Sequence, residues 1–378
     1  MPARPATPPC HRRGAWALRR VLRSLGLALC LASAIGWAAA PAGKAQPPAA
    51  AHPQLKLRIV GGLAGVTQFT QLEGPFWTRD LARLSGGRYS AEIVAFDRAG
   101  VPGSDMLRLL QLGVVPFGTV LMSSLTAQHP LYTAADLPGL NPDMATLRAT
   151  LAAVRPALEQ ALRSEQNVEP LAIYVYPAQV LFCRDRLQGL DDLRGRMVRV
   201  SSAAQGDFVA ALGAQPRLVP FAQLMQSMQG GTLDCAVTGT MSGNILGLHE
   251  HTRYLHPMAL SWGLAIFGAH RPAWQALPQD LRALLQAQLP RLESAIWRSA
   301  EEETAEGVAC NTGQPACRRG RRGGMTLVPL TPRDDARRLQ VLRASVLPRW
   351  LERCGAPCAE LWRSTIEPER RIELPASP

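Results

Sequence analysis

The sequence of 378 residues lacks the short motifs that mark common catalytic and nucleotide-binding sites. It contains no GxSxG nucleophile elbow, no Walker loop, no HExxH zinc motif and no GxGxxG loop after a strand. The neighbouring acids Asp191 and Asp192 stand beside "LRGR" and are typical of a turn and a helix start rather than of paired catalytic carboxylates. The histidines of "HEHTRYLH" (249–256) do not share one helical face, so they favour a solvated helix end over a metal site. We therefore expect no enzyme, no resident cofactor and no metal.

The sequence also lacks a dense cluster of Lys and Arg with interleaved aromatic residues. The formal net charge is +12, but the first 45 residues hold seven basic residues and no acid. The rest of the chain has 34 basic and 29 acidic residues, a balance of +5. The nearest approach to a basic cluster is "RRGRR" (318–322), in a Gly-rich loop. This distribution argues against a nucleic-acid partner.

The basic N-terminal segment resembles an export signal. Basic residues at 19–23 precede the apolar run "LGLALCLASAIGWAAA" (25–40), and small residues follow. The run is short for a membrane span of about 20 residues, and no later segment is apolar enough to be one. We expect residues 1–45 to be a cleaved signal peptide and 46–54 a flexible leader. An uncleaved anchor and a twin-arginine signal remain alternatives.

Cysteine usage fits an oxidising compartment. Beyond the signal segment lie six cysteines, an even number: Cys183, Cys235, Cys310, Cys317, Cys354 and Cys358. The short spacings within "CNTGQPAC" and "CGAPC" favour two small disulfide loops, which leaves Cys183 to pair with Cys235. Spacing alone permits other pairings, and a zinc site is the competing interpretation.

Strand and helix patterns alternate along the chain, which predicts an α/β fold. In the first part we expect strands over 55–63, 89–96 and 116–124 and helices over 75–87 and 104–113. A second alternation follows, with strands over 170–183 (broken at Pro177), 197–202, 216–220 and 232–239 and helices over 203–213 and 221–231. A crossing strand over 262–269 then leads into a long helix over 278–308, where Pro290 predicts a kink.

Arg199 is the residue that most calls for an explanation. It stands between two valines in the apolar segment "MVRV" (197–200). An unpaired buried charge is costly, so either Arg199 faces solvent or it awaits an anion. Ligands of open α/β sheets bind at the carboxyl ends of strands. Ser201 follows the Arg199 strand, and Thr238 lies at the same end of the strand "LDCAVTG", so all three side chains could face one pocket.

The segment "LDDLRGRMVRV…ALGAQPRLVPFAQLMQSMQGGTLDCAVTG" (190–239) resembles the second lobe of DctP-type substrate-binding proteins of tripartite ATP-independent periplasmic (TRAP) transporters. The family pattern combines DLxGxxxR-V, LGAxP and QxGxxD, and this chain carries Asp192, Gly195 and Arg199 in the first of these. "GVPGSDMLRLLQLG" (100–113) and "WQALPQDLRALLQ" (274–286) resemble further family segments. The likeness covers residues 55–305.

The resemblance implies a two-lobed periplasmic binding protein fold with a cleft between the lobes, crossing strands and a long kinked helix spanning both. It assigns 55–175 and 265–305 to lobe 1 and 176–264 to lobe 2, and leaves 306–378 as a cysteine-containing extension, which we expect to pack on lobe 2.

The resemblance also implies that Arg199 binds the carboxylate of a small organic acid. Closure of the lobes captures this ligand, and the protein delivers it to TRAP membrane permease subunits. Gln179 replaces an arginine common in the family, and Thr238 replaces an asparagine. The loss of one cation favours a monocarboxylate, or a carboxylate with an apolar body, over a dicarboxylate. Tyr176, near the hinge, and Trp262, on the crossing segment, are weaker candidates for lining the cleft.

Two other functions remain open. The protein could deliver its ligand to a sensor instead of a permease, which neighbouring genes for permease subunits or for a sensor kinase would distinguish. An exported enzyme using the same cleft is less favoured, because no nucleophile–base pair is visible in the sequence.

Overall fold

The computed structural model describes residues 55–375 of the chain. The predicted signal peptide and leader, with Cys10 and Cys30, lie outside the described residues. None of the helices among residues 55–375 combines the length and the apolar character needed to cross a membrane.

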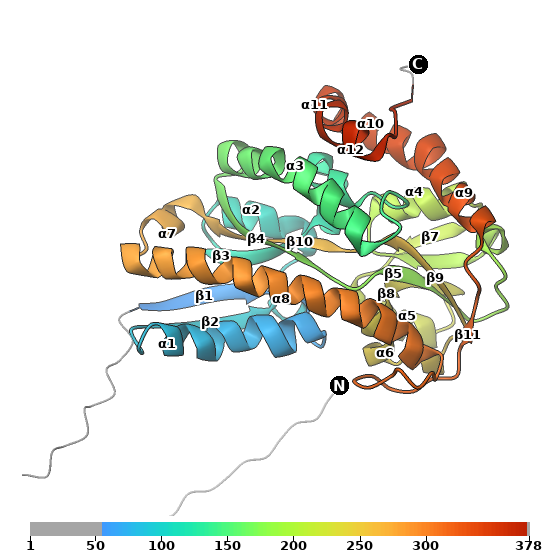
Figure 1. Cartoon of the computed structure of the whole chain (residues 1–378), viewed down its shortest axis with the longest axis horizontal. Coiled ribbons are helices and arrows are strands. Elements are labelled where there is room, and N and C mark those ends of the chain that lie inside the picture. The colour runs from blue at the N-terminus through green and yellow to red at the C-terminus, as the bar shows by residue number, and fades with distance from the viewer. Residues whose placement is uncertain (1–54, 376–378) are drawn as a thin grey trace, which may run out of the picture. The chain divides into compact units, whose positions relative to one another are not determined.

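The first sheet has the strand order β2-β1-β3-β10-β4 (Figure 1). Strand β1 pairs in parallel with β2 and β3, whereas β10 runs antiparallel to β3 and β4. The strand bounds are β1 Leu55–Gly61, β2 Tyr89–Ala95, β3 Phe117–Leu121, β4 Val168–Val175 and β10 Leu264–His270.

The second sheet has the order β11-β9-β5-β8-β6-β7. Strands β7, β6 and β8 are parallel, and β5 is antiparallel to both β8 and β9. The strand bounds are β5 Gln179–Cys183, β6 Met197–Val200, β7 Gln215–Leu218, β8 Cys235–Gly239, β9 Tyr254–Ser261 and β11 Thr326–Leu327.

The chain passes between the sheets at two short crossings. β4 of the first sheet ends at Val175 and β5 of the second begins at Gln179. β9 of the second sheet ends at Ser261 and β10 of the first begins at Leu264. This confirms the predicted α/β architecture of two lobes joined by crossing strands.

The helices cover both sheets. Their bounds are α1 Leu81–Leu84, α2 Met106–Gln111, α3 Met144–Glu165, α4 Ala203–Ala211, α5 Leu224–Gln229, α6 Thr240–Leu246, α7 Arg271–Gln275 and α8 Gln279–Asn311. The turns before α1 are π-type (η1 Gln68–Glu73 and η2 Phe76–Asp80), so this helical stretch begins earlier than the predicted residue 75. Short 3-10 segments include η3 Phe96–Arg98, η6 Pro130–Asp136 and η8 Phe221–Gln223.

Side-chain caps explain where two of these helices begin. Asp143 accepts a hydrogen bond from the N–H of Thr146 at the start of α3. Ser202 accepts one from the N–H of Gln205 at the start of α4. No helix or strand is predicted for the α3 region, so this 22-residue helix is a finding of the structure.

The long helix α8 packs against β4 and η1 on the side of the first sheet and against α6 and β9 on the side of the second (Figure 1). Pro290 lies within it, and the helix continues to Asn311. Residue 306, where we expected the extension to start, is therefore inside α8. Trp297 donates an indole hydrogen bond to the carbonyl of Ile173 (2.8 Å), which attaches the helix to the crossing strand β4.

The C-terminal extension forms α9 Pro332–Val341, η10 Leu342–Val346, α10 Leu347–Cys354, α11 Ala356–Leu361, η11 Trp362–Ile366 and α12 Glu367–Arg370. We expected it on lobe 2, and it does contact α4 there, where Arg353 pairs with Asp207. It also contacts η6 and α3, and Trp350 donates to the carbonyl of Pro130 (2.8 Å). The buried rings of Trp350 and Trp362 pack together, with centroids 5.8 Å apart.

Three disulfides join the six cysteines in the suggested pairing: Cys183–Cys235, Cys310–Cys317 and Cys354–Cys358. The first links the neighbouring strands β5 and β8 in register. Because these cysteines are bonded in disulfides, they offer no thiolates to a zinc ion, which argues against the competing zinc site.

Candidate ligand-binding site

A cavity of about 580 Å³ lies between the strand ends of the two sheets. Its volume is in the range of small-molecule sites, which are concave and mostly apolar. The second sheet contributes segments that follow β6, β7 and β8, and the first contributes segments that follow β1, β2 and β3. Apolar side chains that line it include Leu63, Phe96, Leu121, Val219, Phe221 and Leu264.

Arg199 lies in this cavity and not at the outer surface. Arg199 is only 2% exposed, which rules out the alternative that its side chain faces solvent. Its Nε donates to the carbonyl of Val219 (2.9 Å) and its Nη1 to the carbonyl of Val237 (2.6 Å). Burial lowers the pKa of Arg199 to about 10, so the guanidinium stays charged at neutral pH.

The charge of Arg199 has no counterion within the described part of the chain. No carboxylate among residues 55–375 lies within 4.0 Å of its guanidinium, and Nη2 has no hydrogen-bond acceptor there. Two neutral carbonyls fix the side chain without neutralising it. A planar guanidinium held this way presents its remaining N–H groups to an anion, and carboxylates match that geometry with two parallel hydrogen bonds.

The start of α4 adds to the positive character of the same wall. Ser202, the residue that caps α4, and Ala203, its first residue, both line the cavity. The N-terminus of a helix carries free N–H groups and a partial positive charge, both of which favour an anion.

Thr238, Gln179 and Ser201 line the cavity beside Arg199. Strand β8 brings Thr238 there because it pairs in parallel with β6, with Ala236 opposite Arg199. Strand β5 brings Gln179, which lies opposite Gly239. The structure thus groups the polar candidates that the sequence suggests.

Gln205 holds two of these side chains in place, and sequence reasoning missed it. Its Nε2 donates to the side-chain oxygen of Gln179 (2.8 Å) and to the hydroxyl of Ser261 (2.8 Å). Its Oε1 accepts from the backbone N–H (2.8 Å) and the hydroxyl (3.1 Å) of Ser201. The signal that could have identified Gln205 is a polar residue in the first turn of α4, next to the end of β6.

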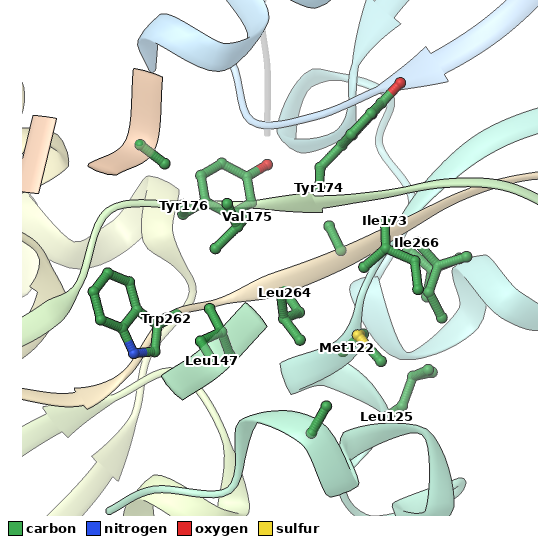
Figure 2. Packing of buried hydrophobic residues seen from close by; sticks show 14 of the residues in the cluster. Met122, Leu125, Leu147, Ile173, Tyr174, Val175, Tyr176, Trp262, Leu264 and Ile266 are labelled. Atoms are coloured by element: carbon green, nitrogen blue, oxygen red, sulfur yellow. The ribbon is translucent and has the colours of Figure 1, made fainter. Parts of the chain in front are cut away.

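Tyr176 and Trp262 lie on opposite sides of the crossing strands (Figure 2). Tyr176 lines the cavity, and its hydroxyl accepts from the N–H of Leu63 (3.3 Å). Burial and the nearby carboxylate of Glu73 raise the pKa of Tyr176 well above its usual range. Trp262 does not line the cavity: it packs near Leu147, and its indole donates to the carbonyl of Asn141 (3.0 Å). Its candidacy rested on chain position, which does not give the direction of the side chain.

Gly263 shapes the second crossing. Its φ of +77° is in the left-handed region, and a Cβ there would lie 2.5 Å from Nε2 of Gln179. Any larger residue would be strained and would displace Gln179. The carboxylate of Asp136 accepts from the N–H groups of Trp262 (2.9 Å) and Gly263 (2.7 Å), which fixes this turn.

Two carboxylates of the first lobe, also missed by sequence reasoning, lie near the Tyr176 side of the site. Glu73 is fully buried and accepts from the N–H of Gly62 (2.8 Å) and the hydroxyl of Thr119 (3.1 Å). Burial raises the pKa of Glu73 to about 7. Asp97 follows β2, lines the cavity and accepts from the N–H of Ala64 (2.7 Å).

Residues 55–375 contain no group of three or more His, Cys, Asp or Glu side chains placed to hold a metal ion. The expected solvated helix end at 249–256 is wrong for His256. It is fully buried in β9, and its Nε2 lies 3.6 Å from Oδ1 of Asp334 in the extension.

Comparisons with known proteins agree with this architecture. A family model described as bacterial extracellular solute-binding protein, family 7 (DctP), matches residues 66–336. No curated protein sequence matches the chain significantly.

Three solved structures share the fold. DctP7, a Bordetella pertussis extracytoplasmic solute receptor binding pyroglutamic acid, has a TM-score of 0.73 at 21% identity, covering 82% of this chain and 99% of that one. A TRAP periplasmic solute-binding protein of Desulfovibrio salexigens with bound orotic acid has a TM-score of 0.71 at 18% identity, covering 84% and 99%. One of Sulfitobacter sp. NAS-14.1 with bound β-D-galacturonate has a TM-score of 0.69 at 15% identity, covering 82% and 99%.

Proposed function

The chain belongs to the DctP family of bacterial extracellular solute-binding proteins, and from this premise we propose that it captures a small organic carboxylate on Arg199. The ligand binds in the cavity between the two lobes, with Thr238, Ser201 and Gln179 beside its carboxylate. The bound, closed form is then recognised by the permease subunits of a TRAP-type transporter.

The uncompensated charge of Arg199 is the observation that carries this proposal. A buried cation without a counterion costs free energy, and an arriving carboxylate removes that cost while making charge-assisted hydrogen bonds. The guanidinium is held by carbonyls before the ligand arrives, so little side-chain entropy is lost on binding.

The likeness to solved binding proteins supports a carboxylate ligand. Pyroglutamic acid, orotic acid and galacturonate, the ligands of the three structures above, each carry one carboxyl group. Gln179 is uncharged, so this wall of the cavity offers one guanidinium for one carboxylate. The part of the ligand beyond its carboxylate is selected by the other residues that line the cavity.

Capture proceeds by closure of the lobes. The cavity has walls from both sheets, and the chain crosses between them at 176–178 and 262–263. A ligand that contacts both walls binds the closed arrangement better than the open one, so it shifts the population toward closure. A hinge of a few residues at strand ends is the usual means of such a motion.

Export to the periplasm and delivery to a permease complete the proposal. Export requires that residues 1–45 act as a cleaved signal peptide, which mass spectrometry of the secreted protein tests directly by reading its N-terminus. Delivery requires permease subunits, and ligand uptake by cells that express them with and without this protein tests that step.

The ligand itself is found by a thermal-shift screen of the protein that starts at Gln46. The panel contains mono-, di- and keto-carboxylates, with neutral sugars as controls. A ligand that binds the folded state alone raises the melting temperature, and the rise grows with the logarithm of its concentration relative to its dissociation constant. A carboxylate response that disappears in Arg199→Ala supports the proposal, and responses confined to neutral sugars contradict it.

A further inference from the structure

Among the described residues that line the cavity, the charged ones are Arg199 and Asp97. They stand on different lobes. Arg199 lies in β6 near its carboxyl end, and Asp97 follows the carboxyl end of β2. The cavity therefore has a cationic wall in the second lobe and an anionic group in the first.

The carboxylate of Asp97 is only partly used by the protein. Its Oδ1 accepts from the N–H of Ala64, and no other donor from residues 55–375 is within hydrogen-bond distance. No Lys, Arg or His nitrogen of the described chain lies within 4.0 Å of it. The bond to Ala64 positions the loop after β1, but a neutral Asn would serve that purpose equally well. The negative charge is left facing the cavity.

An anionic group opposite the guanidinium decides which carboxylates fit. A dicarboxylate long enough to cross the cavity would bring its second negative charge toward Asp97 and would be repelled. A carboxylate whose other end carries an N–H, O–H or ammonium group would instead donate to the free oxygen of Asp97. Such a ligand satisfies one group on each lobe at the same time.

We propose that Asp97 is a specificity-determining residue, and that the ligand is a monocarboxylate with a hydrogen-bond donor or an ammonium group at the end remote from its carboxylate. This inference rests on the proposed function, because it requires the carboxylate to be on Arg199. A ligand that is bound by both Arg199 and Asp97 joins the two lobes. Contact between the ligand and Asp97 therefore contributes to closure.

The test uses straight-chain acids of four, five and six carbons, each with a methyl, hydroxyl, amino or carboxyl group at the remote end. Dissociation constants are measured by isothermal titration for the wild-type protein, for Arg199→Ala and for Asp97→Asn, which keeps an acceptor for Ala64. Asp105→Asn is the matched control, because Asp105 is an exposed acid of the same lobe that does not line the cavity.

In the wild-type protein we expect the amino or hydroxyl form to bind at least tenfold more tightly than the dicarboxylate of the same length. Asp97→Asn should abolish that preference by weakening the amino form and strengthening the dicarboxylate, each by about threefold, and Asp105→Asn should leave it unchanged.

The outcomes separate the two proposals. If acids bind in an Arg199-dependent way but Asp97→Asn does not alter their ranking, the role of Asp97 is refuted and the carboxylate site stands. If none of the acids binds the wild-type protein, or binding does not depend on Arg199, both proposals are refuted.

Discussion

Removing the guanidinium of Arg199 should abolish ligand binding while leaving the unliganded fold nearly as stable as before. In Arg199→Ala the carbonyls of Val219 and Val237 each lose a donor, at a net cost of about 1 kcal/mol per hydrogen bond. The variant also loses an uncompensated buried cation. Burial lowers the pKa of Arg199 from its usual value to about 10, which corresponds to about 3 kcal/mol of destabilisation. The two effects nearly cancel, so the melting temperature of the unliganded protein should change by only a few degrees.

The effect on binding is much larger. Two charge-assisted hydrogen bonds between a guanidinium and a carboxylate contribute about 1.5–3 kcal/mol each. Losing both removes about 3–6 kcal/mol, which raises the dissociation constant by about 10² to 10⁴. Arg199→Lys should fall between, because an ammonium keeps the charge but not the planar pair of donors.

The assay is isothermal titration with the best carboxylate from the thermal-shift screen, with circular dichroism to verify folding. Arg217→Ala is the matched control, because Arg217 lies opposite Arg199 on the neighbouring strand β7 but is exposed and does not line the cavity. Its dissociation constant should equal that of the wild type. Equal binding by a folded Arg199→Ala variant, or equal losses in both variants, would refute the reasoning.

Stability and affinity measurements on three further variants test the remaining parts of the structure. Because burial raises the pKa of Glu73 from 4.5 to about 7, the folded protein holds this proton more tightly than the unfolded chain does. The free energy of unfolding should therefore fall by about 3 kcal/mol between pH 4.5 and 7 relative to Glu73→Gln, and identical pH profiles in urea unfolding would contradict this. Replacing Cys183 and Cys235 together by Ala opens a loop of 52 residues and should lower the free energy of unfolding by about 4 kcal/mol, measured in urea without reductant. Thr238→Val keeps the shape but loses the hydroxyl, and titration should show about fivefold weaker ligand binding, whereas unchanged affinity would remove Thr238 from the site.

Much of the fold could be predicted because its strands and helices follow simple patterns of burial. The strand predicted over 197–202 begins at Met197 and ends at Val200, and the helix predicted over 203–213 begins at Ala203 and ends at Ala211. The break at Pro177 does separate β4 from β5. The helix α3 was missed although the sequence carries the signals of a helix. Asp143 caps it, and apolar residues recur at helical spacing along its buried face: Met144, Leu147, Leu151, Val154, Leu158 and Leu162. The contact of the extension with α3 and η6 depends on tertiary packing, which local patterns do not encode.

Within the site, side-chain directions could be predicted where a residue's position on a strand determines the direction. Alternation along β6 and β8 places Arg199 and Thr238 at the same sheet edge, and the structure brings both to the cavity. Trp262 was misjudged because it lies in a turn, where no periodicity gives the direction of a side chain.

Asp97 illustrates why ligand specificity is harder to predict than ligand class. The clamp is visible in the sequence because a charge inside an apolar strand is unusual, whereas an acid in a loop after a strand is common and draws no attention. Its importance arises only when the second lobe places Arg199 across the same cavity. A protein that captures its ligand between two lobes therefore divides recognition between two parts of its sequence. Arg199, in a strand, binds the carboxylate that all such ligands share. Asp97, after a strand of the other lobe, distinguishes one carboxylate ligand from another.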